Sequence, residues 1–167
     1  MNDFKEISPL ELENAMKLIG KDWMLITARS GDKINTMTAS WGCMGVLWGK
    51  NVCIVFIRPQ RYTYEFTEKS DKLSLSFFDD SYKEALSFCG THSGRDCDKF
   101  VKNGLSASMD GDTPIIDQAR IVLECKKLYA DDLKEGNFIF DEPLVNYKNK
   151  DFHRFYICEI EKVLVKK

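Results

Sequence analysis

The run Val52-Cys53-Ile54-Val55-Phe56-Ile57 is the stretch of sequence that decides the fold. Consecutive apolar residues, rich in β-branched side chains, are typical of a strand that is buried on both faces. Pro59 follows shortly afterwards, and because its nitrogen carries no hydrogen it cannot extend a strand ladder. We therefore expect a buried strand over 52–57 that ends before Pro59.

Further segments with strand character cover 23–28, 34–41, 73–78, 121–128 and 155–160. Short helices are predicted over 62–69, 83–88 and 96–102, and another from the capping box Ser8-Pro9-Leu10-Glu11 to Gly20, with Leu12, Met16 and Ile19 on one face. Many strands with few helices favour a β-barrel, because closure removes exposed sheet edges. No repeat or linker interrupts the chain, so we expect a single domain over 1–167.

The composition of the chain excludes several classes of protein. Of its 167 residues, 44% are hydrophobic and 30% are charged, which is the balance of a folded protein. The net charge of −2 provides no basic field, so no nucleic acid partner is expected. No run of about 18 apolar residues is present, so no contact with a membrane is expected.

Cysteine usage indicates a reducing compartment. Six cysteines are spread along the chain, and the start Met1–Glu6 is too charged for the apolar centre of a secretory signal. We therefore expect reduced, mostly buried thiols and a cytoplasmic location. Cys89 and His92 lie close together, but without a second ligand pair they do not predict a metal site.

Two arginines follow the buried strand, in Arg58-Pro59-Gln60-Arg61-Tyr62-Thr63. Thr63 is a reasonable cap for the helix that begins here, and free amide hydrogens at a helix start bind phosphate together with guanidinium groups. The segment therefore predicts a phosphate site made by Arg58 and Arg61. The alternative is that both are solvated loop arginines, and a salt bridge within the protein at this corner would contradict the phosphate site.

A second basic segment, Ser93-Gly94-Arg95-Asp96-Cys97-Asp98-Lys99-Phe100, lies at a predicted helix start. Ser93 and Asp96 have the spacing of a capping box, so the helix is expected to begin just after Gly94. Arg95 and Lys99 then share a helix face, and Gly94 allows a ligand to approach the backbone. The alternative is a capped surface helix on which neighbouring aspartates balance the two cations.

A third segment, Asn35-Thr36-Met37-Thr38-Ala39-Ser40-Trp41, lies where one strand passes to the next. Its small residues 38–40 leave backbone N–H groups within reach of a flat, polar ring edge, although a plain exposed strand explains the segment equally well. His153 stands alone at the entrance of the last strand, and a lone histidine is more often structural than catalytic. No Gly-x-Ser-x-Gly elbow is present, so hydrolase chemistry is not expected.

These three segments, in this order and followed by Phe152-His153-Arg154, resemble the flavin reductase-like family of FMN-binding split barrels, which includes flavoredoxins. The resemblance extends from Trp23 to Val163, and the ordered co-occurrence of the motifs is more specific than any one of them. It implies a mainly β fold, a six-stranded antiparallel Greek-key split β-barrel with short peripheral helices. It also implies a homodimer with one FMN per subunit near the interface. Cys158 replaces a glycine that is frequent in the family, a departure that leaves the flavin motifs intact.

The resemblance also implies which residues hold the cofactor. Residues 58–63 would hold the phosphate and ribityl chain, 38–40 would meet the isoalloxazine edge, and 93–99 would complete the surroundings. The full expected set is Thr36, Thr38, Ala39, Ser40, Trp41, Arg58, Arg61, Tyr62, Thr63, Ser93, Gly94, Arg95 and Lys99. Arg95 or Lys99 is expected beside the pyrimidine edge, where a cation stabilises the reduced ring. His153 is the one side chain with a conceivable catalytic role, since the flavin carries the chemistry.

The expected function is that of an FMN-dependent redox protein. Bound FMN would take electrons from NAD(P)H or from a redox protein and pass them to a flavin, a protein or a small molecule. Two alternatives stay open. One is a flavin-binding or electron-carrier module without turnover, and the other is a barrel that has lost its cofactor.

Overall fold

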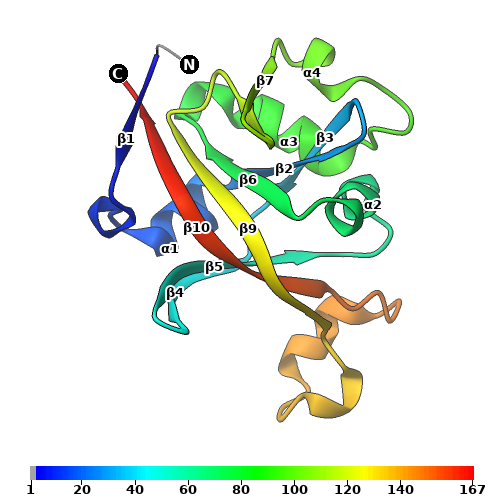
Figure 1. Ribbon diagram of the computed structural model, residues 1–167. Helices are drawn as coiled ribbons and strands as arrows, with labels where there is room; N and C mark the ends of the chain where they lie inside the picture. Colours follow the sequence, from blue (N-terminus) through cyan, green and yellow to red (C-terminus); the bar gives the residue numbers. More distant parts are fainter. Residues whose placement is uncertain (1–2) are drawn as a thin grey trace.

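The structure is a computed structural model that describes residues 3–167 (Figure 1). Met1 and Asn2, which belong to the charged start, lie outside the described residues. The strands of the described chain are β1 (Phe4–Ile7), β2 (Met24–Ser30), β3 (Lys33–Ala39), β4 (Gly42–Leu47), β5 (Lys50–Ile57), β6 (Lys72–Phe77), β7 (Ala107–Asp110), β8 (Thr113–Ile116), β9 (Ile121–Asp132) and β10 (Arg154–Lys166). The α-helices are α1 (Ala15–Lys17), α2 (Tyr62–Lys69), α3 (Lys83–Thr91) and α4 (Lys99–Lys102), and shorter or irregular helical turns are η1 (Pro9–Glu11), η2 (Leu18–Asp22), η3 (Asp80–Tyr82), η4 (Glu135–Asn137) and η5 (Glu142–Tyr147).

One antiparallel sheet forms the body of the molecule. Its strand order is β3-β2-β6-β9-β10-β5-β4, and β1 pairs with β10 as well. The long strands β9 and β10 run side by side through the middle of the sheet, and β7 and β8 form a separate hairpin (Figure 1). Every one of the six predicted strands is present, so the mainly β, antiparallel prediction is confirmed.

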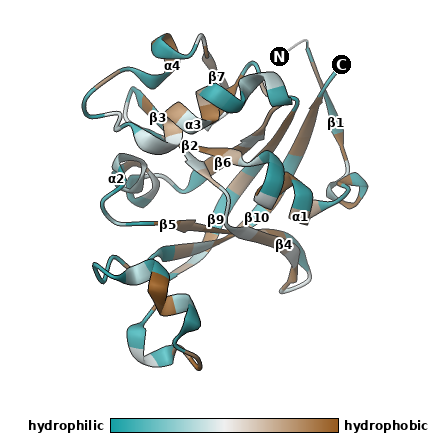
Figure 2. Cartoon of the chain, turned by 180° about the vertical axis from the view of Figure 1, so that it is seen from behind, coloured by the Kyte–Doolittle hydropathy of each residue, from teal (hydrophilic) through white to brown (hydrophobic). Residues whose placement is uncertain are grey.

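Two apolar cores lie on opposite faces of the sheet. Ile26, Leu75 and Leu123 belong to the core inside the curved sheet. Leu25 and Val122, one position away on the same strands, belong to a second core together with residues of α3 and β8. Because side chains alternate along a strand, neighbouring residues enter different cores, and hydrophobic stretches follow the strands in Figure 2. The sheet is therefore packed on both faces behind the loops that carry the polar segments.

Strand β5 is buried less completely than its sequence predicts. Cys53, Val55 and Ile57 face the inner core and are buried, whereas Ile54 and Phe56 on the other face are only half-buried. On that face only Val52 is buried, so the expected burial on both faces is wrong for most of the strand. Strand β4, which was not predicted, forms a hairpin with β5 through Trp48-Gly49, whose φ values of 54° and 69° are those of a type I′ turn.

The N-terminal helix predicted over residues 8–20 is broken. The capping box between Ser8 and Glu11 does form, but this helical turn ends at Glu11. Asn14 then adopts a left-handed conformation, with φ of 52°, and caps the short α1. Met16, which was assigned to an apolar face, is 90% exposed. Ile19 is buried as expected, but with Met16 in solvent the three residues do not form one buried face that would favour a continuous helix.

Helix α4 begins later than predicted. The carboxylate of Asp98 accepts hydrogen bonds from the amides of Phe100 and Val101, at 2.9 and 3.1 Å, so Asp98 is the cap. Ser93 instead stabilises a turn, where its hydroxyl oxygen accepts from the amide of Arg95 at 3.1 Å. The expected helix start after Gly94 is therefore wrong by several residues, and 93–98 form a loop.

A lobe, Leu133–Phe152, joins β9 to β10 and extends away from the barrel (orange in Figure 1). Its aromatic rings pack on one another, and Tyr147 stacks on Phe152 with ring centroids 4.8 Å apart. Ile139 and Phe140 are 86% and 76% exposed. Within residues 3–167, no helix has the length and apolar character needed to cross a membrane.

Candidate functional site

The ends of β3 and β5 and the start of β10 surround an open pocket of about 190 Å³, which we call the arginine pocket. Residues far apart in the sequence form its walls, so the fold brings two of the three expected segments together and adds Met37 and Phe56. The lining residues are Met37, Thr38, Ala39, Ser40, Trp41, Phe56, Arg58, Arg61 and His153.

A second open pocket of about 440 Å³, which we call the lysine pocket, lies between β3, α2 and the loop before α4. The expected residues Tyr62, Gly94, Arg95 and Lys99 are part of its wall. The carbonyl oxygen of Cys89 accepts hydrogen bonds from Arg61 Nη2 at 3.2 Å and from Lys99 Nζ at 3.0 Å. Cys89 therefore links a cation of the arginine pocket to a cation of the lysine pocket.

Arg58 does not offer a free guanidinium. Its Nη1 forms a short ion pair with the carboxylate of Asp151, and its Nη2 donates to the carbonyl of Asn146 at 2.9 Å. The guanidinium also lies over the ring of Tyr147, 5.4 Å from the centroid. The guanidinium beside Asp151 holds the pKa of that carboxyl below its usual value. Arg58 therefore forms a salt bridge within the protein, which contradicts the prediction that it is free to bind a phosphate.

Arg61 and Lys99 are cations without a carboxylate partner in the described chain. Neither forms an ion pair within 4.0 Å, and Lys99, only 3% exposed, donates to the carbonyls of Thr36 and Cys89. Burial, followed by repulsion from Arg61, lowers the pKa of Lys99 to about 8. Burial also lowers the pKa of Arg61. Withdrawing positive charge from water without a counter-ion is unfavourable, so this corner of the protein favours an anion.

The positive charge of Arg95, unlike that of Lys99, is balanced by a carboxylate. Its guanidinium forms a short ion pair with Glu65 and lies over the ring of Tyr62, 4.6 Å from the centroid. Both members of the ion pair are about half exposed, and such a pair contributes little to stability. Between the two residues expected to supply a cation to the site, the structure leaves Lys99 unpaired and pairs Arg95.

Comparison with known proteins assigns the chain to a family. The model of the flavin reductase like domain matches residues 16–167. The chain belongs to this family. No curated protein is significantly similar to the chain.

Solved structures share the fold of this flavin reductase-like domain. An FMN-binding domain of a flavin reductases-like enzyme from Shewanella baltica OS155 has a TM-score of 0.70 at 21% identity, with 98% of this chain and 77% of that chain covered. A flavoredoxin from Methanosarcina acetivorans has a TM-score of 0.68 at 19% identity, covering 96% and 77%. A protein with a split barrel domain from Shewanella frigidimarina has a TM-score of 0.70 at 18% identity, covering 95% and 77%. The predicted split-barrel fold is therefore confirmed.

Two expected contact residues of this flavin reductase-like domain are turned inward. Thr36 is fully buried, and its hydroxyl donates to the carbonyl of Ile26 at 3.1 Å. Thr63 is 1% exposed and lies inside α2, whose cap position is Arg61. Neither residue lines either pocket, and the expected role of Thr63 as the cap is wrong, while the expected contacts of Thr36 and Thr63 with the cofactor stay a prediction.

Asn35 is a positioning residue that the sequence reasoning missed. Its Nδ2 donates to Thr63 Oγ1 at 2.8 Å, which fastens β3 to the start of α2. An added Cβ at Gly94 would lie 2.1 Å from Asn35 Oδ1. In the direction of a Cβ, the space beside Gly94 is therefore filled by Asn35, while Gly94 still belongs to the wall of the lysine pocket. Asn35 holds all three motif segments together, and no sequence pattern signals a contact 28 residues away.

The substitution Gly94→Ala is expected to destabilise the protein by about 2 kcal/mol, because the new methyl group overlaps Asn35 and Tyr62. Urea unfolding measures the change. Gly45→Ala, where an added Cβ meets nothing within 4 Å, is the matched control. The overlap predicts non-additivity: once Asn35→Ala is present, Gly94→Ala costs much less. Equal costs in both backgrounds would contradict the packing described here.

His153 forms part of the wall of the arginine pocket and is uncharged at neutral pH. Burial, followed by repulsion from Arg58, lowers its pKa to about 4. Its Nδ1 lies 2.9 Å from the hydroxyl of Tyr147, and its ring centroid lies 5.3 Å from that of Trp41. This environment suits a neutral wall of the pocket better than an acid. Among the described residues, no cluster of His, Cys, Asp and Glu is arranged to hold a metal ion.

Proposed function

We propose that this flavin reductase-like domain binds FMN and transfers electrons through it. The observation that carries the proposal is the pair of cations Arg61 and Lys99, which are withdrawn from solvent without a carboxylate partner in the described chain. A phosphate group with a charge of about −2 would complete such a site. The similarity to a protein described as FMN-binding and to a flavoredoxin supports FMN as the molecule that carries this phosphate.

The residues of the two pockets fit the parts of FMN. Arg61, Lys99 and the free amides at the start of α2 would hold the phosphate, because a helix start favours anions. The backbone of 38–40 would meet the polar ring edge, and Trp41 and Phe56 would offer apolar surface to the ring face. When bound, FMN supplies hydride and electron transfer, so the chain needs no nucleophile of its own.

FMN titration tests the proposal. Wild-type protein is expected to quench the fluorescence of added FMN and to stay yellow after gel filtration, with one FMN per chain. Arg29, which lies away from both pockets, provides a control: Arg29→Ala is expected to bind FMN as the wild type does. A protein that stays colourless and leaves the fluorescence unchanged would contradict the proposed function and support a barrel without cofactor.

The electron donor is proposed to be NAD(P)H or a redox protein, and the acceptor a flavin, a protein or a small molecule. The arginine pocket is open and Trp41 is 45% exposed, which supports direct access for a small donor. Anaerobic addition of NADH or NADPH that bleaches the flavin would support a reductase. Bleaching only by a reduced iron–sulfur protein would support an electron carrier instead.

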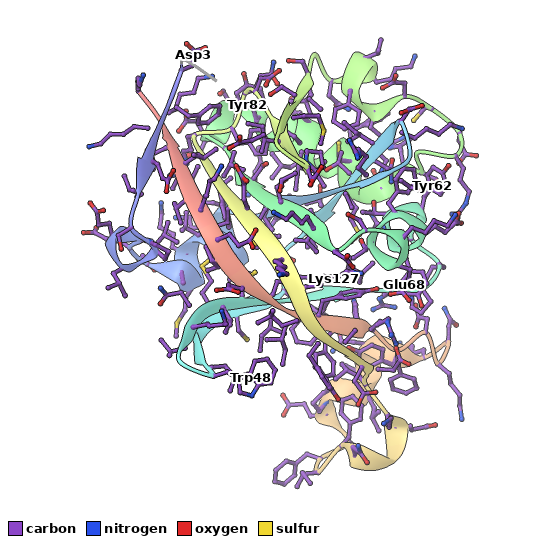
Figure 3. All side chains as sticks on the ribbon, in the orientation of Figure 1. Asp3, Trp48, Tyr62, Glu68, Tyr82 and Lys127 are labelled. Atoms are coloured by element: carbon purple, nitrogen blue, oxygen red, sulfur yellow. The ribbon has the colours of Figure 1, made fainter. Side chains whose placement is uncertain are left out.

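We also propose a homodimer that uses the β4 edge of the sheet. Val46 and Trp48 are 72% and 59% exposed there, and Trp48 projects from the β4–β5 hairpin (Figure 3). Folded proteins usually cover an apolar strand edge with another segment or with a second subunit. A neighbouring apolar hollow shares Ser40 and Trp41 with the arginine pocket, which supports an interface beside the cofactor.

Trp48→Glu is expected to convert this dimer to a monomer, because a carboxylate would be buried in the interface. Size-exclusion chromatography with light scattering measures the change. Ile139→Glu places the same charge on an exposed apolar residue of the lobe and should leave the dimer intact. A wild-type protein that is monomeric at high concentration would rule the dimer out.

A reducing, cytoplasmic location is proposed from the cysteines. All six are free thiols, and four are buried, while Cys97 is half-buried and Cys43 is exposed. Exposed and half-buried free thiols persist in compartments where disulfides do not form. The single domain over 1–167 stays a prediction.

A further inference from the structure

One guanidinium of the barrel makes three contacts with the lobe. Arg58 contacts Asp151, the carbonyl of Asn146 and the ring of Tyr147, and all three belong to the lobe. Neither helical turn of the lobe, η4 or η5, packs extensively against a barrel strand of the described chain. Release of Arg58 would therefore remove the ion pair and one hydrogen bond between the lobe and the barrel, while the hydrogen bonds from Gln60 to Asp151 and between Tyr147 and His153 remain.

The same guanidinium belongs to the wall of the arginine pocket. It lies close enough to Arg61 that the two repel each other, so an anion placed at Arg61 would also attract Arg58. A phosphate and the carboxylate of Asp151 on one guanidinium would in turn repel each other. Arg58 therefore cannot favourably bind the phosphate and the carboxylate of Asp151 at the same time.

The ion pair between the lobe and the barrel is incompletely satisfied. Asp151 Oδ2 accepts from Arg58 and, at 2.8 Å, from Gln60 Nε2. Asp151 Oδ1 is buried and has no hydrogen-bond partner among the described residues. A buried acceptor without a donor weakens the closed arrangement, because its lost hydration is not replaced. The ion pair between Arg58 and Asp151 forms, but it is less stable than one in which both carboxylate oxygens accept hydrogen bonds. Such an ion pair costs less free energy to open.

We propose that the lobe and the anionic ligand of the arginine pocket compete for Arg58, with Asp151 acting as a built-in competitor. This rests on the proposed function, in which the ligand is the phosphate of FMN. Without ligand, Asp151 holds Arg58 and the lobe is fastened to the barrel. With ligand, the phosphate draws Arg58 into the pocket, and the base of the lobe loses its ion pair and loosens. Asp151 thereby lowers the affinity for FMN.

FMN titrations of a double-mutant cycle test the competition. Asp151→Asn removes the competing charge while keeping an acceptor for Gln60, and it is expected to tighten FMN binding about tenfold. Arg58→Ala is expected to weaken binding about tenfold more in the Asp151→Asn background than in the wild type. Asp141→Asn, at an exposed aspartate of the same lobe, is the control and should leave the affinity unchanged. Unchanged or weaker binding by Asp151→Asn would overturn the proposal.

Limited trypsin digestion of the protein without FMN gives a readout that is independent of the proposed function. Lys148 is an exposed cleavage site in the lobe, whereas cleavage after Lys150 is left out of the comparison because Asp151 directly follows that bond. Cleavage there is expected to be faster in Asp151→Asn than in wild type, and saturating FMN should accelerate it in wild type. If no variant binds FMN, the proposed function fails, and the digestion still tests whether Asp151 fastens the lobe. If FMN binds but never alters cleavage, the competition is refuted and FMN binding stands.

Discussion

Replacing Arg61 by alanine and Lys99 by methionine together is expected to weaken FMN binding by about 3–6 kcal/mol. Each charged hydrogen bond contributes about 1.5–3 kcal/mol, and both residues are withdrawn from solvent without a carboxylate partner among the described residues. The loss corresponds to roughly 10²- to 10⁴-fold in Kd, measured by fluorescence titration. The pair is expected to matter more than Arg58, whose charge is already met by Asp151.

The matched control for this double variant is Arg29→Ala with Lys69→Met. It makes the same chemical changes at another pocket on the surface, so it tests whether loss of two positive charges alone weakens binding. We expect the control to bind FMN within about threefold of wild type, which is under 1 kcal/mol. If Arg61→Ala with Lys99→Met binds as tightly as this control, the phosphate site lies elsewhere.

Acidification is expected to destabilise the fold through His153. Its pKa is lowered to about 4 in the folded protein, mainly by burial, against 6.5 when unfolded. Between these values the unfolded state binds more protons, so this contribution to stability is complete above pH 6.5 and is lost as the pH falls towards 4. The loss between pH 7 and 4.5 is about 2–3 kcal/mol. Urea unfolding at the two pH values measures it.

The difference between wild type and His153→Gln isolates this effect. Glu124, whose pKa burial raises to about 8, acts with the opposite sign in the same pH range, so the wild-type curve alone mixes the two. The His153→Gln variant should lose less stability on acidification than wild type by about 2–3 kcal/mol. The exposed His92 provides the control, since His92→Gln should follow the wild-type curve. Parallel curves for wild type and His153→Gln would show that His153 is not buried as a neutral ring.

Local patterns were sufficient to predict six of the ten strands of the described chain and α2. The β-branched run of β5 and the proline after it mark a strand and its end, and helix α2 begins at Tyr62 and ends at Lys69 as predicted. The predicted bounds of two helices were wrong, because solvent exposure of an apolar residue or a different capping residue determined where the helix begins or ends. The apolar spacing of Leu12, Met16 and Ile19 predicts a helix, but the chain turns at Asn14 and leaves Met16 in solvent.

The sequence predicted which residues lie at the site better than it predicted what each of them does. Arg58 and Arg61 have the same side chain and lie three positions apart, so the sequence alone predicts the same role for both. Only the fold reveals that Asp151, 93 residues from Arg58, pairs with one of them and leaves the other without a carboxylate. The contact between Asn35 and Thr63 is hidden for the same reason. Long-range pairing is a property of tertiary packing, which short motifs do not encode.

Comparison of FMN with riboflavin tests the central claim most directly, because riboflavin is the same molecule without the phosphate. If Arg61 and Lys99 bind the phosphate, wild-type protein should bind FMN at least about 100-fold more tightly than riboflavin, or about 3 kcal/mol. In Arg61→Ala with Lys99→Met, most of this preference should be lost while riboflavin affinity stays constant. Equal binding of the two flavins by the wild-type protein would contradict the account.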